Sequence, residues 1–558
     1  MKPHKFCIFA VLLLTPILTP AQSLLLPPAV PLPTGLPVLP ADQRARMDQD
    51  LLEITIPQLE ALYIKGKFTV SDVTRWYLDR IARFNPIYRA VQSVDLDGAL
   101  ARAQAEDRDK NGTHGPLWGV PVVVKANTAV KGLLDSVGWQ GFAIPGHEFI
   151  AEKDATIIAK LRAAGAVIIG VTNMPDFAGS FTTRSTAFGR TGNAYDVRFS
   201  PGGSSGGTVT AVTSNMSLLG TGTDTGDSIR LPSGTSSLVG LVPTRGMVSI
   251  AGIAPLDWLR DNTGPIARDV TDVAIAFGVM AGEDPLDFKT TGSTAKAQPG
   301  PWAQYLKADA LRGKRFGVPA FIFTGPGEPL KPETKEMLMK AVDAFRAAGA
   351  EVVIDDALLP SAFLNNLRKA DTSHYRKDGA DQWIAEFGPA QYRSGDAYSK
   401  VTGQPWPPVF TGAPRNGAPG TPGPAQVILK TDPQAEANYF APQKASLEEY
   451  AAALDRFRLD GLIYPSAQLP PPDETMAQDK DGALSTGPKS ITGWVNAIGV
   501  PAIVVPAGFY PIGLPFGLEI SARPWRDGDL LGFAYAYEQA TKLRKPPVLV
   551  ERGLLPAR

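Results

Sequence analysis

The chain has 558 residues, with 55 Lys and Arg against 55 Asp and Glu, so its formal net charge at pH 7 is zero. This balance gives no electrostatic attraction to nucleic acid or to an anionic membrane surface, and it favours small molecules or neutral polymers as partners. A hydrophobic content of 44% with 20% charged residues is typical of a folded globular protein and excludes an extended disordered chain.

The N-terminus predicts a secretory signal peptide over residues 1–21. Two lysines precede an apolar run over residues 6–17, and small residues follow around the expected cleavage site after Ala21. The run is too short to span a bilayer, so we expect an exported protein, periplasmic or extracellular, without an integral membrane segment. The single cysteine of the chain, Cys7, lies in this segment. The mature chain is therefore expected to have neither disulfides nor a thiol nucleophile.

The remainder of the chain is predicted to form one large domain over residues 51–545. It follows a proline-rich tether over residues 22–50 and precedes a short tail, residues 546–558. Within the domain, apolar residues recur at helical spacing over 56–63 and over 73–81, which predicts two amphipathic helices.

Two later regions share a helix, glycine, strand order. Residues 154–173 predict a helix that stops at Gly165 and leads into an apolar strand, and residues 333–354 repeat the order with Gly349. A further apolar run, 120–124, ends in a lysine. Apolar strands alternating with helices predict an α/β fold in which helices cover both faces of the sheet.

Residues 355–445 interrupt this order with a segment rich in proline and glycine, which predicts a surface excursion. Its aromatic side chains are compatible with an apolar acyl or aryl pocket, or with ordinary packing, and we favour packing. These aromatic residues are Trp383, Phe387, Trp406 and Phe410.

Serines surrounded by glycines are the strongest chemical feature. Ser204 and Ser205 lie in the GGSSGG box at 202–207, and Ser228 lies in the GTDTGDSIRLPSG segment at 222–234. Glycines let backbone N–H groups approach a substrate closely, and a serine hydroxyl becomes a nucleophile once a base takes its proton. If one of these serines is a nucleophile, another residue of the chain must act as the base that takes its proton.

Two residues could act as this base, His374 and Lys125. Gly202-x-Ser204-x-Gly206 formally fits a nucleophile elbow with His374 as the histidine that follows it, but the preceding residues are polar and do not form the apolar strand that an elbow requires. Lys125 is the alternative, because a lysine that ends an apolar strand is partly buried and burial lowers its pKa. We favour the lysine.

Together, the GVPVVVK segment at 119–125 and the two serine boxes resemble the amidase signature family of serine hydrolases. Further segments from about residue 55 to residue 545 are similar to family segments, among them NMPDFAGS, GLVPTRG, DGLIYPS and GVPAIVVPAG. The resemblance implies the amidase signature fold, with a large mixed β-sheet, and hydrolysis of carboxamide C–N bonds with no metal and no organic cofactor. It implies a small-molecule or peptide amide as substrate and leaves the oligomeric state open.

The resemblance also implies the role of each site residue. Ser228 matches the nucleophile, Ser204 a bridging serine that follows a cis peptide bond, and Lys125 the general base. The amides of the loop that ends at Ser228 match the oxyanion hole, and three further residues match supporting positions. The oxyanion residues are Thr225, Gly226 and Asp227, and the supporting residues are Ser205, Asp224 and Arg230.

This sequence departs from the family at two positions. Relatives commonly have Lys-Asp-Asn where this chain has Ala126 after the lysine, and Gly-Gly-Ser where it has Asp227 before the nucleophile. We expect the Asp227 side chain to point away from the substrate; the competing idea is that it favours a cationic group. An esterase or carbamate hydrolase, and a catalytically silent binding protein, stay open as alternative functions.

Overall fold

The computed structural model describes residues 35–547 apart from several short gaps, so the predicted signal peptide and most of the predicted tail lie outside the described residues. The gaps are residues 110, 111, 113, 326–328, 360, 413–421 and 476–486.

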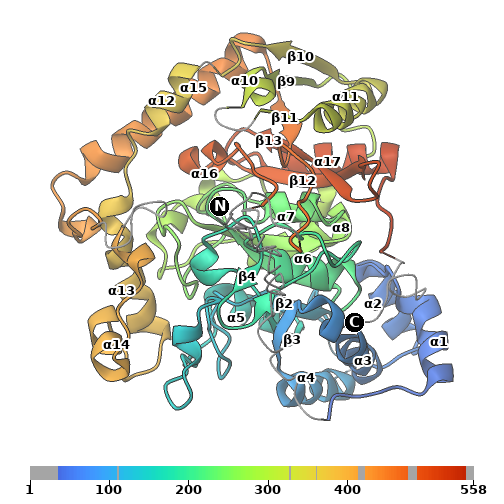
Figure 1. Ribbon diagram of the computed structural model, residues 1–558. Coiled ribbons are helices and arrows are strands. Elements are labelled where there is room, and N and C mark those ends of the chain that lie inside the picture. The colour runs from blue at the N-terminus through green and yellow to red at the C-terminus, as the bar shows by residue number, and fades with distance from the viewer. Residues whose placement is uncertain are drawn as a thin grey trace, which may run out of the picture.

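The core is an eleven-stranded mixed sheet with the strand order β1-β3-β2-β6-β8-β7-β12-β13-β11-β9-β10 (Figure 1). It contains both parallel and antiparallel neighbours, and the predicted α/β fold with a large mixed sheet is confirmed. A separate small sheet pairs β4 (Arg184–Ser185) with β5 (Gly189–Arg190). The strands of the main sheet are β1 Val91–Val94, β2 Pro121–Lys125, β3 Val167–Thr172, β6 Leu219–Asp224, β7 Val239–Val242, β8 Asn262–Ala267, β9 Arg315–Pro319, β10 Glu351–Asp355, β11 Gly461–Pro465, β12 Ala502–Phe509 and β13 Pro515–Ala522.

Helices surround this sheet, and both predicted N-terminal helices are present as α2 and α3. The hydroxyl of Thr69 accepts from the Asp72 amide and caps α3. The helices are α1 Ala41–Leu51, α2 Ile56–Ile64, α3 Val70–Tyr88, α4 Leu96–Arg108, α5 Thr156–Ala163, α6 Gly206–Thr213, α7 Arg230–Gly234, α8 Val270–Met280, α9 Ser293–Lys296, α10 Phe321–Thr324, α11 Pro332–Ala347, α12 Ser361–Leu367, α13 Arg376–Phe387, α14 Gly395–Thr402, α15 Ala441–Phe457, α16 Trp494–Ile498 and α17 Asp527–Thr541.

The boundary of the predicted tether is corrected by α1. Residues 41–50, which the proline content of the preceding segment assigned to the tether, belong to this helix, and it packs on the domain through buried Met47 and Leu51. The indole of Trp76 donates to Asp48 at 2.8 Å and ties α1 to α3. Burial of one helix face, rather than local composition, decides where the domain begins.

Both predicted helix, glycine, strand units are confirmed. Gly165 (φ +97°) lies between α5 and β3, and Gly349 (φ +92°) lies between α11 and β10. Each glycine takes the left-handed conformation that ends a helix, which a side chain would strain.

The predicted excursion contains helices α12, α13 and α14, of which α13 and α14 lie together at one edge of the molecule (Figure 1). Its aromatic side chains pack: the Trp383 ring stacks on Phe149 with centroids 4.8 Å apart, and Trp406 stacks on Phe410 at 4.9 Å. The packing interpretation is therefore confirmed for these rings.

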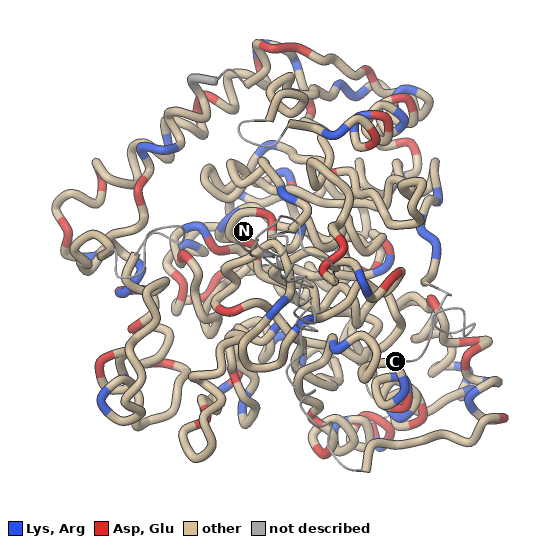
Figure 2. Tube along the Cα trace, viewed as in Figure 1, with Lys and Arg blue, Asp and Glu red and all other residues tan. Residues whose placement is uncertain are grey.

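Charged residues of both signs are interspersed along the outer elements of the fold (Figure 2). Within the described residues, no helix is long and apolar enough to cross a membrane.

The sheet also sets the position of the serine boxes. β2 and β6 are parallel neighbours, with Val122 opposite Leu219 and Val123 opposite Gly220. Both strands therefore end at the same edge of the sheet, which brings Lys125 next to the segment that carries Ser228. Helix α6 begins at Gly206, within the GGSSGG box, and packs on both strands.

Candidate active site

Lys125 is fully buried at the end of β2 and is held by oxygen atoms. Its Nζ lies 2.7 Å from the hydroxyl of Ser204, 2.7 Å from the hydroxyl of Thr223 and 3.3 Å from the Thr223 carbonyl. Asn127 donates to the same Thr223 hydroxyl at 3.1 Å and so fixes it from the other side. The lysine is thus joined to the bridging serine that the sequence predicted.

Burial lowers the pKa of Lys125 to about 7, and the negative charges of Asp224 and Asp261 oppose this shift. Ala126, which follows the lysine, is a buried apolar residue and adds no charge beside it. With hydroxyls as its hydrogen-bond partners, the lysine amine is partly neutral near pH 7 and can accept a proton.

The GGSSGG box is held tightly against neighbouring backbone. The peptide bond between Gly203 and Ser204 is cis, as the resemblance implied. A Cβ on Gly203 would lie 2.4 Å from the carbonyl oxygen of Thr182, and one on Gly207 would lie 2.3 Å from that of Asn173. These glycines are therefore required by close packing.

Ser205 links this box to the nucleophile segment. Its amide donates to the Ser228 carbonyl at 3.2 Å, and its hydroxyl donates to the Thr223 carbonyl at 3.3 Å. The structure therefore brings Lys125, Ser204, Ser205 and Ser228 into one region, in agreement with the predicted supporting position of Ser205.

Ser228 lines a cavity of about 140 Å³ and is 5% exposed. Thr225 and Gly226 form one wall of this cavity, Leu256 another, and residues 178–181 the remainder. None of these described residues carries an ionisable side chain. The cavity therefore offers uncharged surroundings and the backbone of the loop 225–228, which we call the oxyanion loop.

Asp224 and Arg230, two of the predicted supporting residues, form a fully buried ion pair that we call the brace. The Asp224 carboxylate accepts from the guanidinium at 3.2 Å and from the amides of Asp227 and Ile229 at 2.7 and 2.8 Å. Burial opposes ionisation of Asp224, but Arg230 outweighs it and keeps the pKa of this carboxyl below its ordinary value. The brace fixes the backbone on both sides of Ser228.

The role expected of the Asp227 amide needs correction. This amide donates to Asp224, so it serves the brace and does not face the cavity as an oxyanion donor. The Asp227 side chain is 1% exposed, lies 2.9 Å from the Arg230 guanidinium and accepts from Thr492 at 2.5 Å. It points away from the Ser228 cavity, as expected, and the idea that it binds a cationic substrate group loses its basis.

Several residues of the site carry no local sequence signal. Glu519 on β13 accepts from Arg230 at 2.5 Å, and its second carboxyl oxygen lies 3.1 Å from the Thr492 hydroxyl. Asn496 accepts from the same arginine at 2.6 Å. Asp261 accepts a hydrogen bond from the Thr225 hydroxyl. These partners are distant in sequence, and only the strand order of the sheet brings them together. Thr223 precedes Asp224 and Asn127 lies two residues after Lys125, so both could have been found from the predicted motifs.

The buried carboxyl of Glu519 is expected to make the stability of the protein depend on pH. Burial raises the pKa of its carboxyl from 4.5 to about 8, so the folded state retains a proton that the unfolded state releases. The free energy of unfolding is therefore expected to fall as pH rises from about 4.5 to 8. In Glu519→Gln this part of the pH dependence should be absent, as measured by urea unfolding at several pH values. Parallel curves for the two proteins would contradict the assignment.

The nucleophile elbow is not formed. His374 lies in the excursion, where its Nε2 is 3.5 Å from Asp371 and its Nδ1 is 3.1 Å from the Ala425 carbonyl. Ser204 is bonded to Lys125 instead.

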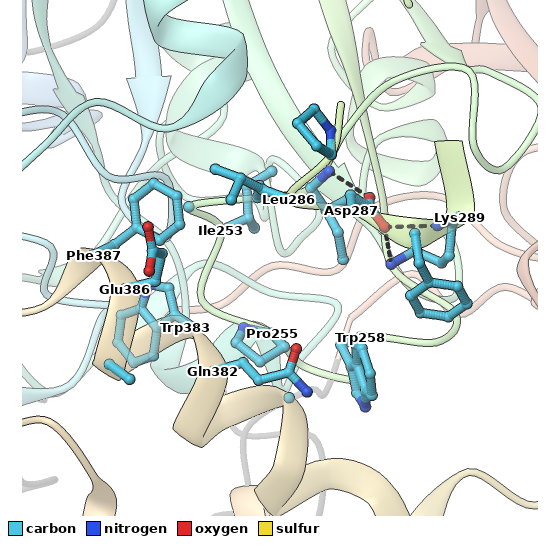
Figure 3. A pocket seen from close by; sticks show the side chains of 17 residues that line it. Ile253, Pro255, Trp258, Leu286, Asp287, Lys289, Gln382, Trp383, Glu386 and Phe387 are labelled. Atoms are coloured by element: carbon cyan, nitrogen blue, oxygen red, sulfur yellow. Dashed lines mark hydrogen bonds and ion pairs between the residues drawn. The ribbon is translucent and has the colours of Figure 1, made fainter. Parts of the chain in front are cut away.

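A second, larger cavity of about 440 Å³ lies between the segments 250–258, 285–289 and 379–387 (Figure 3). Trp383 and Phe387 of the excursion contribute to its wall. The charged residues drawn in Figure 3 are paired: Lys289 lies 2.7 Å from Asp287, and Glu386 pairs with Lys153.

A mixed α/β sheet that carries paired serines and a buried lysine at the ends of adjacent strands defines a hydrolase of the amidase class. The chain belongs to the amidase family, whose model matches residues 72–531.

Individual relatives agree with this class. The chain is 32% identical over 522 residues to a subunit of the glutamyl-tRNA(Gln) amidotransferase of Symbiobacterium thermophilum, and the match covers 90% of this chain and 99% of the relative. The native peptide amidase of Stenotrophomonas maltophilia has a similar structure, with a TM-score of 0.72, 28% identity and coverage of 89% of this chain and 98% of that one. The peptide amidase PAM in complex with the competitive inhibitor chymostatin gives a TM-score of 0.73 with 28% identity, and covers 89% of this chain and 99% of its own.

Proposed function

We propose that this protein hydrolyses carboxamide C–N bonds through an acyl-enzyme on Ser228, with Lys125 as general base and Ser204 as proton relay. The observation that carries the proposal is the 2.7 Å contact between the Lys125 amine and the Ser204 hydroxyl, both fully buried. A neutral lysine in this position can take a proton from Ser204 while Ser204 takes the proton of Ser228.

The chemistry proceeds in two halves. The Ser228 oxygen attacks the amide carbon, its proton passes through Ser204 to Lys125, and the oxyanion forms beside the amides of Thr225 and Gly226. The proton then returns through Ser204 to the leaving nitrogen, and the C–N bond breaks to release ammonia or an amine. Water then attacks the acyl carbon, and its proton passes through Ser204 to Lys125. The ester C–O bond breaks, the proton returns to the Ser228 oxygen, and the carboxylic acid is released.

The surroundings of Ser228 favour an uncharged substrate group next to the scissile bond. The described wall of its 140 Å³ cavity is formed by backbone, small side chains, Phe181 and Leu256. A charged group there would lose its hydration without gaining a partner. Similarity to a peptide amidase supports peptide amides and small neutral amides as candidate substrates.

The test is to measure ammonia or amine release from primary amides, peptide amides and anilides, with matched esters and carbamates alongside. Acylation is located by mass spectrometry after treatment with a serine-directed phosphonate. We expect amide turnover and labelling at Ser228. Faster turnover of esters or carbamates than of matched amides would favour the alternative hydrolase, and a folded protein that neither turns over nor labels would overturn the proposal.

The rate is expected to depend on the protonation of Lys125. Since the base must be neutral in the free enzyme and its pKa is about 7, kcat/KM should rise with pH through about 7 and then level off. Initial rates on one neutral amide between pH 5 and 9 measure this. A profile that is flat over this range would contradict the role of the lysine.

Export of the protein is also part of the proposal and rests on the sequence of residues 1–21. Mass spectrometry of the protein recovered outside the cytoplasm tests it, with a mature N-terminus near residue 22 as the expected result.

A further inference from the structure

We propose that Asp261 is a positioning residue that holds the oxyanion loop and the Leu256 wall of the Ser228 cavity in one arrangement. This inference rests on the proposed function and concerns a residue that motif analysis did not select. Asp261 is 3% exposed and directly precedes β8.

The sheet register explains how Asp261 reaches the oxyanion loop. β6 and β8 are antiparallel, and Asp224 lies opposite Asn262. The next residue after β6 and the residue before β8 therefore face each other, and these are Thr225 and Asp261. The Thr225 hydroxyl donates to Asp261 Oδ1. Thr225 also lines the cavity beside Ser228, so this contact fixes the side chain of a loop residue next to the nucleophile.

The same carboxylate holds the opposite wall. Asp261 Oδ2 accepts from the amide of Leu256 at 2.9 Å and from that of Asp257 at 3.1 Å. Leu256 lines the Ser228 cavity, whereas its neighbours Pro255 and Trp258 line the larger cavity (Figure 3). The segment 255–258 is thus a shared wall between two cavities, and Asp261 ties it to the oxyanion loop.

A carboxylate suits this position because it only accepts hydrogen bonds, and it meets three donors here: one hydroxyl and two amides. Loss of the carboxylate would leave two buried amides and the half-buried Thr225 hydroxyl without this acceptor and free both walls to shift. Displacement of catalytic groups by about 1 Å can lower a rate by about 100-fold.

Three variants separate the two arms of this contact. Asp261→Ala removes both, Thr225→Val removes only the arm to the oxyanion loop, and Asp261→Asn keeps an oxygen for the amides and an NH₂ group for the Thr225 oxygen. Asp527→Ala is the matched control, because Asp527 is also a buried carboxylate that accepts from a threonine hydroxyl and an amide, those of Thr244. kcat, KM, Tm and the rate of phosphonate labelling at Ser228 are measured for each.

We expect Asp261→Ala to lower kcat by about 100-fold and to raise KM, and Thr225→Val to lower kcat by about 10-fold with little change in KM. Asp261→Asn should recover most of the loss. Asp527→Ala should lower Tm without lowering kcat. The proposal is overturned if Asp261→Ala changes Tm as Asp527→Ala does but leaves kcat and the labelling rate unchanged, or if Thr225→Val leaves both rates unchanged.

The labelling rate separates this inference from the proposed function. If the wild-type protein labels at Ser228 but turns over no amide, the proposed reaction fails while the positioning role is still decided by the labelling rates of the variants.

Discussion

Replacing Ser228 with alanine is expected to lower kcat on a neutral amide by about 10⁴-fold or more, and Lys125→Met by a similar factor. Without Ser228 no acyl-enzyme forms, and without Lys125 the proton of Ser228 has no acceptor beyond Ser204. Because both residues serve the same step, the double variant should be no slower than the slower single variant. Steady-state rates of the four proteins measure this.

The control for this series is Ser446→Ala. Ser446 is also fully buried, but its hydroxyl donates to the Pro442 carbonyl within its own helix region, distant in sequence from the serine boxes. It should keep the wild-type kcat. Single variants whose effects multiply in the double variant would show that the two residues act in separate steps and would contradict the proton route.

The sequence predicts those site residues whose role leaves a pattern in the residues next to them. Lys125 ends an apolar strand, and the glycines around Ser204 are required by the close approach of the Thr182 and Asn173 backbone. Such requirements act on neighbouring residues, so they leave a local pattern. The α/β fold follows in the same way from apolar strands that alternate with helices ended by glycine.

The contacts of Glu519 and Asp261 depend on the order and register of the strands, which the pattern of neighbouring residues in the sequence does not determine. Glu519 reaches Arg230 because β13 lies next to β12, on which α7 packs. Asp261 reaches Thr225 through the register of β8 against β6. Asp227 shows what the resemblance could not predict. Its position before the nucleophile suggested an oxyanion donor, but its amide donates to the Asp224 carboxylate instead.

Replacing Arg230 with methionine is expected to be the most destabilising change in the brace. Its guanidinium is fully buried and lies 3.2 Å from Asp224, 2.9 Å from Asp227 and 2.5 Å from Glu519. Removing one partner of a buried ion pair leaves uncompensated charge and costs about 3–5 kcal/mol. Urea unfolding and Tm measure the loss, and both should show it most strongly at high pH, where the carboxyls are ionised.

The exposed pair of Arg315 and Glu351 gives the control for that measurement. Their side chains are 32% and 60% exposed, so Arg315→Met should cost no more than about 1 kcal/mol. In Arg230→Met the carboxyls that have lost the guanidinium take up protons as the pH falls, so the difference in stability between the variant and the wild type should then shrink. A difference that is the same at pH 5 and pH 8 would mean that lost packing, and not unpaired charge, accounts for the effect. Arg230 would then support the backbone around Ser228 by filling space and not by its charge.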